Sequence, residues 1–317
     1  MAEHNVHLSK LGFNIQSAQP STLVQHNHYQ DFHLILGTYN NKPMVARVVN
    51  TERSTLNYRK RFLTLDKSAV NTLHHPYLCT TYLLSDLTKC LVLITEFASN
   101  GSMLDLLLRI RPRPIDEQSA HRYYCQFGSA LKYMHSNGFA HRNLKCEKIL
   151  LFSNESSDDG ITNSTQIYCK LSDYGFTRSA FPTNHREPLL PGEKTFCASA
   201  AYVAPEVLIQ TMGGIKQRPF NLFLTDVWSA GIVLYTMVHG GQLPFQDWNL
   251  RNLIISQQTQ KYNLGGNGDE HNVNLSPNYL SDNLKQFIKL HLNPDPTTRP
   301  DMDNIFKHHW LEKVTFN

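Results

Sequence analysis

The chain has 317 residues, of which 41% are hydrophobic, and a formal net charge of +4 at pH 7. This length fits one two-lobed domain better than two independent ones. The weak positive charge excludes the concentrated basic field of nucleic-acid-binding proteins, so we expect no nucleic-acid partner. The longest apolar run, near residues 230–238, is far shorter than the ~20 residues that span a bilayer, so we expect no membrane segment.

Three short strands are predicted near the N-terminus, at residues 11–15, 32–36 and 44–49. The polar stretch Tyr39-Asn40-Asn41-Lys42-Pro43 predicts a tight turn between the last two strands. Apolar residues at helical spacing then predict a helix over residues 56–73. This helix must end before Pro76, because proline disfavours helix in the residue that precedes it.

Two more strands are predicted at residues 77–84 and 90–95, followed by a helix from about Asp116 to Ser136. Asp116 is suited to cap the start of that helix, and Gly138 lies just beyond its end. One face of the helix is apolar and carries Ala120, Tyr124, Phe127, Leu131 and Met134. A polar loop at residues 153–166 then separates two short strands, and the second covers residues 167–172.

The 6 cysteines show no CxxC spacing, no mixed Cys and His ligand spacing, and no secretory signal before them. We therefore expect reduced thiols in a cytoplasmic protein.

The most informative stretch reads His141-Arg142-Asn143-Leu144-Lys145-Cys146-Glu147-Lys148-Ile149-Leu150-Leu151, and Asp173-Tyr174-Gly175 follows it. It resembles the catalytic loop of eukaryotic protein kinases, which reads His-Arg-Asp-Leu-Lys-x-x-Asn and is followed by Asp-Phe-Gly. The resemblance implies a bilobal α+β kinase fold. Residues 1–97 would form a small β-rich N-lobe and residues 98–317 a larger helical C-lobe, together one kinase-like domain.

Two letters of this motif differ from the kinase pattern. In kinases the loop Asp accepts the proton of the substrate hydroxyl, while the Asn and the second Asp hold magnesium. Asn143 replaces the base and Lys148 replaces the Asn ligand. An amide can orient a hydroxyl but has no useful basicity, and Lys145 cannot compensate for that loss.

Asp173 is the only one of these metal ligands that the chain keeps. Two arrangements of Lys148 stay open. Its ammonium can contact Asp173 and block the metal site, or it can neutralise the phosphates of ATP and allow binding without a metal.

The N-lobe motifs also depart from the kinase pattern. No glycine occurs from Asn14 to Leu36, where a kinase has the Gly-rich loop that lets backbone amides approach the phosphates. Arg47 replaces the phosphate-binding lysine, and Asp66 replaces its glutamate partner. Arg47 and Asp66 would either form an ion pair of similar span or be two separate surface charges.

The resemblance also places the adenine site. Thr95 would guard the pocket, backbone groups of Glu96 and Ala98 at the hinge would hold adenine, and Leu150 would lie against the base. ATP and magnesium are the cofactors that the family implies, and the substitutions above count against both.

Thr195 lies two residues before Cys197, where related kinases carry an activating phosphothreonine. Its phosphate would pair with Arg142, and the alternative is an unmodified loop threonine.

Further motif residues imply an intact C-lobe scaffold. Glu206 of Ala204-Pro205-Glu206 is expected to pair with Arg299. Asp226 is expected to start the central C-lobe helix and to accept backbone hydrogen bonds from the catalytic loop.

The segment from Thr195 to Leu208 and the trio Lys145-Cys146-Glu147 resemble the testis-specific serine/threonine kinase family, whose members act in late sperm development. We weigh three hypotheses. The first is a pseudokinase that regulates partner proteins, such as an active kinase or its client. The second is a weak serine/threonine kinase that uses Glu147 or Asp173 as a substitute base. The third is a nucleotide sensor that works without metal.

Overall fold

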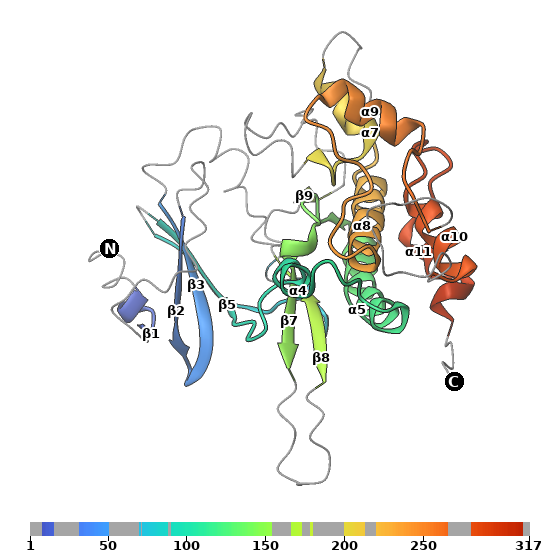
Figure 1. Cartoon of the computed structure of the whole chain (residues 1–317). Helices are drawn as coiled ribbons and strands as arrows, with labels where there is room; N and C mark the ends of the chain where they lie inside the picture. The colour runs from blue at the N-terminus through green and yellow to red at the C-terminus, as the bar shows by residue number, and fades with distance from the viewer. Residues whose placement is uncertain are drawn as a thin grey trace, which may run out of the picture.

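The computed structural model describes residues 8–15, 32–50, 70, 72–87, 90–153, 166–172, 178–179, 200–212, 220–265 and 280–312. Its N-terminal part contains an antiparallel five-stranded sheet in the order β1-β2-β3-β5-β4. The strands are β1 (Phe13–Ile15), β2 (Phe32–Tyr39), β3 (Lys42–Asn50), β4 (Thr81–Asp86) and β5 (Cys90–Glu96). Figure 1 shows this sheet on one side of the molecule and the helices on the other.

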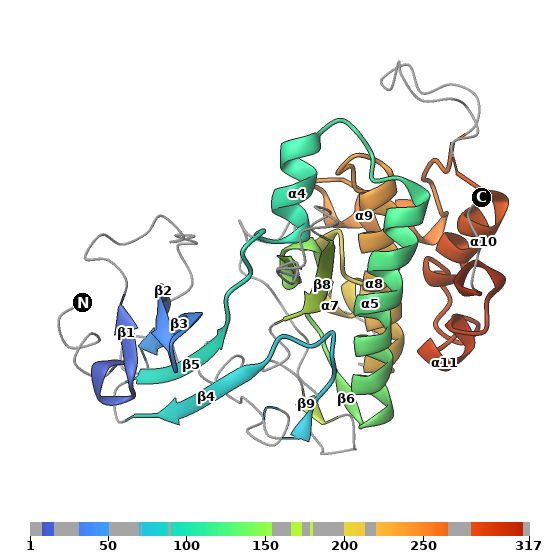
Figure 2. The same ribbon diagram turned by 90° about the horizontal axis from the view of Figure 1, so that it is seen from below.

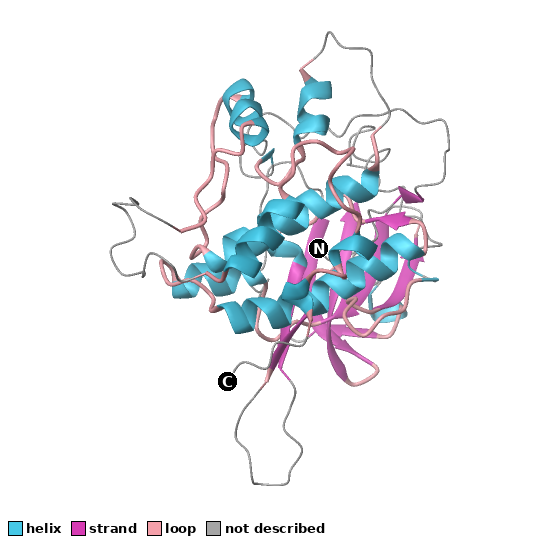
Figure 3. Ribbon diagram, turned by 90° about the vertical axis from the view of Figure 1, so that its right-hand side faces the viewer, coloured by secondary structure: helices cyan, strands magenta, loops and turns pink. Residues whose placement is uncertain are grey.

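The C-terminal part is mainly helical (Figure 3). Its helices are α4 (Met103–Ile110), α5 (Glu117–Ser136), α7 (Pro205–Thr211), α8 (Leu222–Val238), α9 (Leu250–Gln258), α10 (Asp282–His291) and α11 (Met302–Ile305), with the 3₁₀ turns η1 (Cys146–Lys148) and η3 (His309–Leu311). Two small sheets join β6 (Phe139–Ala140) to β9 (Arg178–Ser179) and β7 (Ile149–Ser153) to β8 (Ile167–Leu171). The predicted two-lobed α+β fold is confirmed.

The turn predicted between β2 and β3 is a two-residue hairpin. Asn40 and Asn41 have φ angles of 50° and 59°, and Tyr39 pairs directly with Lys42. Asparagine tolerates positive φ better than most residues, which explains why this pair can turn the chain.

The long helix α5 forms as the sequence predicts. The Asp116 side chain accepts a hydrogen bond from the Ser119 N–H at 2.8 Å and so caps the helix start. The predicted apolar face is fully buried and forms part of the C-lobe core: Ala120, Tyr124, Phe127, Leu131 and Met134.

Several predicted strand boundaries were wrong. Strand β2 continues to Tyr39 and β3 begins at Lys42, so both extend into the predicted turn. Residues 77–80 do not belong to β4, because the Tyr77 carbonyl and the Cys79 N–H bond to Leu171 of β8. Residues 11 and 12 form a turn before β1. Most of the predicted helix 56–73, and most of the loop at 153–166, lie outside the described residues.

Asp226 does not start the central helix α8, contrary to the sequence-based expectation. Asn221 caps the helix, because its side-chain oxygen accepts the Phe223 N–H at 2.9 Å. Asp226 therefore lies inside the helix, and only 1% of it is exposed. Among the described residues, no helix is long and apolar enough to cross a membrane.

Helix α8 crosses α10 at very close range. A Cβ atom added at Gly231 would lie 2.4 Å from the Cβ atom of His291, which is far inside van der Waals contact. A glycine is required here by the backbone approach and not by its φ angle.

We expect Gly231→Ala to lower the free energy of unfolding by about 1–3 kcal/mol, the usual cost of overpacking. Alanine favours helix more than glycine does, but by only about 1 kcal/mol. Urea denaturation measures the change, with Lys289→Ala on the exposed side of α10 as the control. Equal stability of Gly231→Ala and the wild type would contradict this packing argument.

His291 is a buried neutral histidine in the same core. Its Nδ1–H donates to the Phe287 carbonyl at 2.8 Å. The other ring nitrogen, Nε2, then accepts the Tyr124 hydroxyl at 2.5 Å. Burial is the main cause that lowers the pKa of His291 to about 4, and the charges of His308 and Arg299 contribute in the same direction.

Stability should therefore fall as the pH drops below the unfolded-state pKa of about 6.5, because only the unfolded chain binds the proton easily. Protonation of His291 in the unfolded chain should by itself lower the free energy of unfolding by about 2 kcal/mol between pH 7 and pH 5. The measurement is the free energy of unfolding against pH for the wild type and His291→Gln, with the exposed His309→Gln as control. The same pH slope in wild type and His291→Gln would contradict the assignment.

Candidate active site

The catalytic loop is held by one buried carboxylate. Asp226 accepts the His141 N–H at 2.6 Å through Oδ2 and the Arg142 N–H at 2.7 Å through Oδ1. His135 Nε2–H also donates to Oδ2, at 3.0 Å. Arg142 has a φ angle of 67°, a conformation that L-residues avoid unless their surroundings impose it. The predicted bonds from the loop to Asp226 are therefore present.

A second set of bonds ties the loop to the end of β8. His141 Nε2–H donates to the Ser172 carbonyl at 2.8 Å. Ser172 returns two bonds to the Lys148 carbonyl, from its N–H at 2.8 Å and from its hydroxyl at 3.0 Å. These bonds fix the position of the loop relative to Ser172, the residue just before Asp173.

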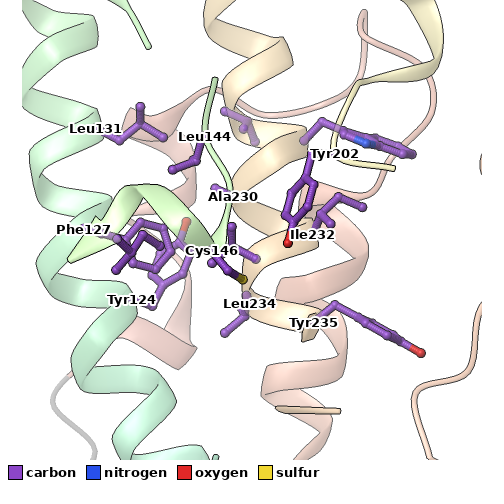
Figure 4. Packing of buried hydrophobic residues seen from close by; sticks show 14 of the residues in the cluster. Tyr124, Phe127, Leu131, Leu144, Cys146, Tyr202, Ala230, Ile232, Leu234 and Tyr235 are labelled. Carbon is purple, nitrogen blue, oxygen red and sulfur yellow. The ribbon is translucent and has the colours of Figure 1, made fainter. Parts of the chain in front are cut away.

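Alternate loop residues enter the core. Leu144 and Cys146 are 2% and 0% exposed, and Figure 4 shows both between α5 and α8. Burial raises the pKa of the Cys146 thiol to about 12, so this thiol is no nucleophile at neutral pH. Asn143 and Lys145 are only half-buried, which is consistent with side chains at the edge of a site.

The cations of the loop differ in their surroundings. Lys145 Nζ lies 3.4 Å from Glu147 Oε1, with side chains 20% and 29% exposed. Lys148 ends the 3₁₀ turn η1 and is half-buried. Asp173 lies outside the described residues, so the contact between Lys148 and Asp173 stays a prediction.

The predicted nucleotide-binding residues lie on neighbouring strands. Arg47 of β3 lies between Leu34 of β2 and Leu93 of β5. Thr95 is in register with Val45 of β3. Asp66 lies outside the described residues, so its pairing with Arg47 stays a prediction.

The predicted hinge begins with Glu96, the last residue of β5. The Ala98 carbonyl accepts the Gly101 N–H at 3.2 Å, which closes a turn after the hinge. Leu150 of β7 forms an isolated bridge with Ser102 just beyond that turn. The structure therefore brings Glu96, Ala98 and Leu150 onto adjoining segments.

Sequence reasoning missed Lys170, whose ammonium lies 2.5 Å from Glu96 Oε2. The only sequence signal was a cation in the middle of a predicted short strand. That signal does not identify a partner 74 positions away.

The predicted pair between Glu206 and Arg299 is present. Arg299 donates through Nη1 and Nη2 to the two carboxylate oxygens at 2.8 and 3.0 Å. It also donates to the carbonyls of Leu224 and Asn293, both at 2.8 Å, and lies over the Trp228 ring at 5.1 Å. A bidentate pair with such additional donors satisfies a buried guanidinium.

The predicted regulatory threonine Thr195 lies outside the described residues, so its phosphorylation and its pairing with Arg142 stay predictions. Within the described ranges, no group of His, Cys, Asp and Glu residues is arranged to hold a metal.

We expect Asp226→Asn to loosen the catalytic loop. Whichever way the amide is turned, its NH₂ faces a backbone N–H that now lacks an acceptor, and a buried donor left unpaired costs about 1–3 kcal/mol. Hydrogen exchange at the His141 and Arg142 amides should accelerate. The control is Asp303→Asn, whose carboxylate makes an exposed pair with Lys132. Unchanged exchange at both amides would contradict the role of Asp226.

Comparison with known proteins agrees with this geometry. A model of the protein kinase domain matches residues 34–311. Testis-specific serine/threonine-protein kinase 3 of Homo sapiens is 32% identical over 271 residues, which are 85% of this chain and 87% of that protein. Testis-specific serine/threonine-protein kinase 1 of Mus musculus is 30% identical over 272 residues, 85% of this chain and 65% of that protein.

A plant kinase is similarly related. CBL-interacting serine/threonine-protein kinase 7 of Arabidopsis thaliana is 29% identical over 240 residues, 76% of this chain but only 47% of that protein. The match thus spans less than two thirds of the length of some of these relatives. Since the domain model covers most of the residues and the catalytic loop is held as described, the chain belongs to the protein kinase domain family, and testis-specific serine/threonine kinases are among its relatives.

Proposed function

We propose that this protein is a pseudokinase, which regulates another protein by binding it and not by transferring phosphate. The observation that carries the proposal is a contrast within one loop. Asp226 and Ser172 hold the loop backbone in place, while Asn143 and Lys148 stand where the family has its base and a metal ligand.

A protein kinase domain implies ATP and magnesium in general. The donor set of this chain does not fit the two magnesium ions of that pattern, because the lysine ammonium at position 148 has no lone pair for a metal and repels it. The lost base and the lost ligand act on the same step, and together they leave little phosphoryl transfer.

The weak-kinase alternative needs a substitute carboxylate. Glu147 is one sequence-based candidate, but its Oε1 lies 3.4 Å from Lys145 Nζ. This contact engages the carboxylate with the lysine of the same loop, so it is not free to receive the proton of a substrate hydroxyl. This geometry favours the pseudokinase over a kinase that uses Glu147.

A second candidate function is nucleotide binding without metal. It is supported by the charges of the site, where Arg47, Lys145 and Lys148 are cationic and the base position is a neutral amide. Side-chain cations can neutralise the phosphates of a nucleotide in place of a metal ion. In this hypothesis the hinge segment and Leu150, which forms a bridge with Ser102, would hold the adenine base.

The relatives suggest where the protein acts. Several carry "testis-specific" in their names, and we extend that to a role for this chain in sperm development. Its partner would be a protein, either an active kinase or a substrate of one, and the site of action would be the cytoplasm.

We expect millimolar ATP to leave the melting temperature unchanged in the presence of magnesium, because a protein without ligand binding gains no stability by mass action. The measurement is the melting temperature with and without ATP, in magnesium and in EDTA. The variant Asn143→Asp/Lys148→Asn restores both family residues and should gain a magnesium-dependent shift. Lys132→Asn, on the surface of α5, controls for loss of a lysine.

The outcomes separate the hypotheses. A wild-type shift in magnesium alone, with phosphate transfer to a peptide, would revive the weak kinase. A shift that survives EDTA would establish the metal-independent nucleotide site. No shift under either condition leaves the protein-binding function, and co-purification of partners then becomes the direct test.

A further inference from the structure

Three arginines lie close together where helix α4 ends: Arg109, Arg111 and Arg113. All three are exposed, and Figure 2 shows the loop that carries the chain from the end of α4 to α5, at the edge of the helical part. Leu108, beside them, is 58% exposed. Like charges at this spacing repel one another unless an anion lies among them.

The carboxylates on either side of this arginine cluster are engaged in helix caps. Asp105 Oδ2 accepts the Ser102 N–H and the Ser102 hydroxyl, both at 2.7 Å. Asp116 Oδ1 accepts the Ser119 N–H at 2.8 Å. The ion pairs formed within the described part of the chain include none of the three arginines. The cluster therefore has no carboxylate partner among the described residues.

The three arginines differ in what holds them. Arg109 lies in the last turn of α4, where the helix dipole favours a cation, and it donates to the Asn100 carbonyl at 3.4 Å. Arg111 and Arg113 follow that turn. Within the described ranges, neither of their guanidinium groups has a hydrogen-bond acceptor. These two groups are the ones available to a ligand.

The backbone that carries them is firmly held. The Arg113 N–H donates to the Ile110 carbonyl at 2.9 Å and closes a turn. Ile115 is 7% exposed, and its N–H donates to the Met237 carbonyl of α8 at 2.9 Å. A backbone fixed in this way need not be ordered again when a ligand binds, which lowers the entropy cost of binding.

The chemistry of the cluster favours a phosphate group. All three cations are arginines, whose planar guanidinium donates two parallel hydrogen bonds to a phosphate. Arg111 and Arg113 are two positions apart, so their Cα atoms lie within about 7 Å, and both side chains can reach one group. A phosphorylated serine or threonine carries a charge of about −2. Two guanidinium groups neutralise that charge, whereas a single carboxylate would leave one of them unpaired.

The size of the cluster favours a peptide over a membrane surface or a nucleic acid. Polybasic segments that bind anionic lipids contain about 4–8 lysines or arginines, and this cluster contains 3. The formal net charge of the chain is only +4, which gives little long-range attraction to a nucleic acid. A single phosphate on a peptide segment matches the available charge.

We propose that Arg111 and Arg113, assisted by Arg109, bind a phosphoserine or phosphothreonine in a segment of a partner protein. The exposed Leu108 supplies an apolar contact for the residues beside the phosphate. The inference deepens the proposed function and rests on it in one respect, since it takes the partner to be an active kinase or a substrate of one. A kinase substrate is phosphorylated by definition.

The position of the cluster relates it to the candidate active site. Helix α4 has 8 residues and so is about 12 Å long. It begins after Ser102, which forms a bridge with Leu150, and the cluster lies at its other end. A segment bound at the cluster therefore lies about one helix length from Leu150.

The test measures peptide binding by the full chain. The probe is a fluorescein-labelled library of nine-residue peptides with phosphoserine at the centre and mixed residues elsewhere, titrated by fluorescence anisotropy. Matched libraries carry serine or glutamate at the centre. We expect the phosphoserine library to bind about tenfold more tightly than either, because two guanidinium groups contact the phosphate.

Two variants test the arginines themselves. Arg111→Gln/Arg113→Gln should lose the preference for phosphoserine and keep the wild-type melting temperature, since both side chains are exposed. Arg111→Lys/Arg113→Lys keeps the charge without the paired donors and should lose part of the preference. The matched control is Arg251→Gln/Lys261→Gln, which removes two exposed cations at and just after α9 and should bind like the wild type.

The results that would overturn the proposal are distinct. They are equal binding of the phosphoserine library and either matched library by the wild type, or an unchanged preference in Arg111→Gln/Arg113→Gln. Sedimentation of the wild type with vesicles of phosphatidylserine and phosphatidylcholine, without a preference for phosphoserine, would overturn it in favour of a membrane surface. Failure of the proposed function would appear separately, as phosphate transfer from ATP by the wild type.

Discussion

The carboxylate of Asp226 is the interaction on which the candidate site depends. It reaches from the interior of α8 and accepts the N–H groups of two successive loop residues, His141 and Arg142. Two charge-assisted bonds at 2.6 and 2.7 Å compensate for the unfavourable φ of Arg142. Once the loop is anchored there, the His141 ring can reach the Ser172 carbonyl, and the end of β8 is fixed as well.

Residues that hold the fold and residues that would perform the reaction occupy different positions in this loop. Leu144 and Cys146 are in the core, where a change of volume or polarity destabilises the protein. Asn143, Lys145 and Lys148 are half-buried at the edge of the site, where a substitution alters the chemistry at small cost in stability. A kinase fold can therefore keep its shape while its catalytic residues change.

The contacts around the hinge also separate groups that hold the fold from groups that would perform the reaction. The hairpin of β7 and β8 is bonded through its backbone to residues 77–79 before β4 and to residues 100–101 after the hinge, and these bonds do not depend on which side chains perform chemistry. The pair of Glu96 and Lys170 adds a contact shielded from water beside the segment that holds adenine in kinases. The Glu96 carboxylate and the Lys170 ammonium thus stabilise the fold at the position where protein kinases bind a nucleotide.

The sequence by itself determined the features that depend on local pattern. Apolar spacing and the Asp116 cap defined α5, the Asn40-Asn41 pair defined a hairpin turn, and the catalytic-loop letters identified both the family and the substitutions. Tertiary structure alone decided that His135 meets Asp226 and that Lys170 meets Glu96. The reason is physical: spacing and capping act within a few residues, whereas these two contacts join residues 91 and 74 positions apart, which only packing brings together.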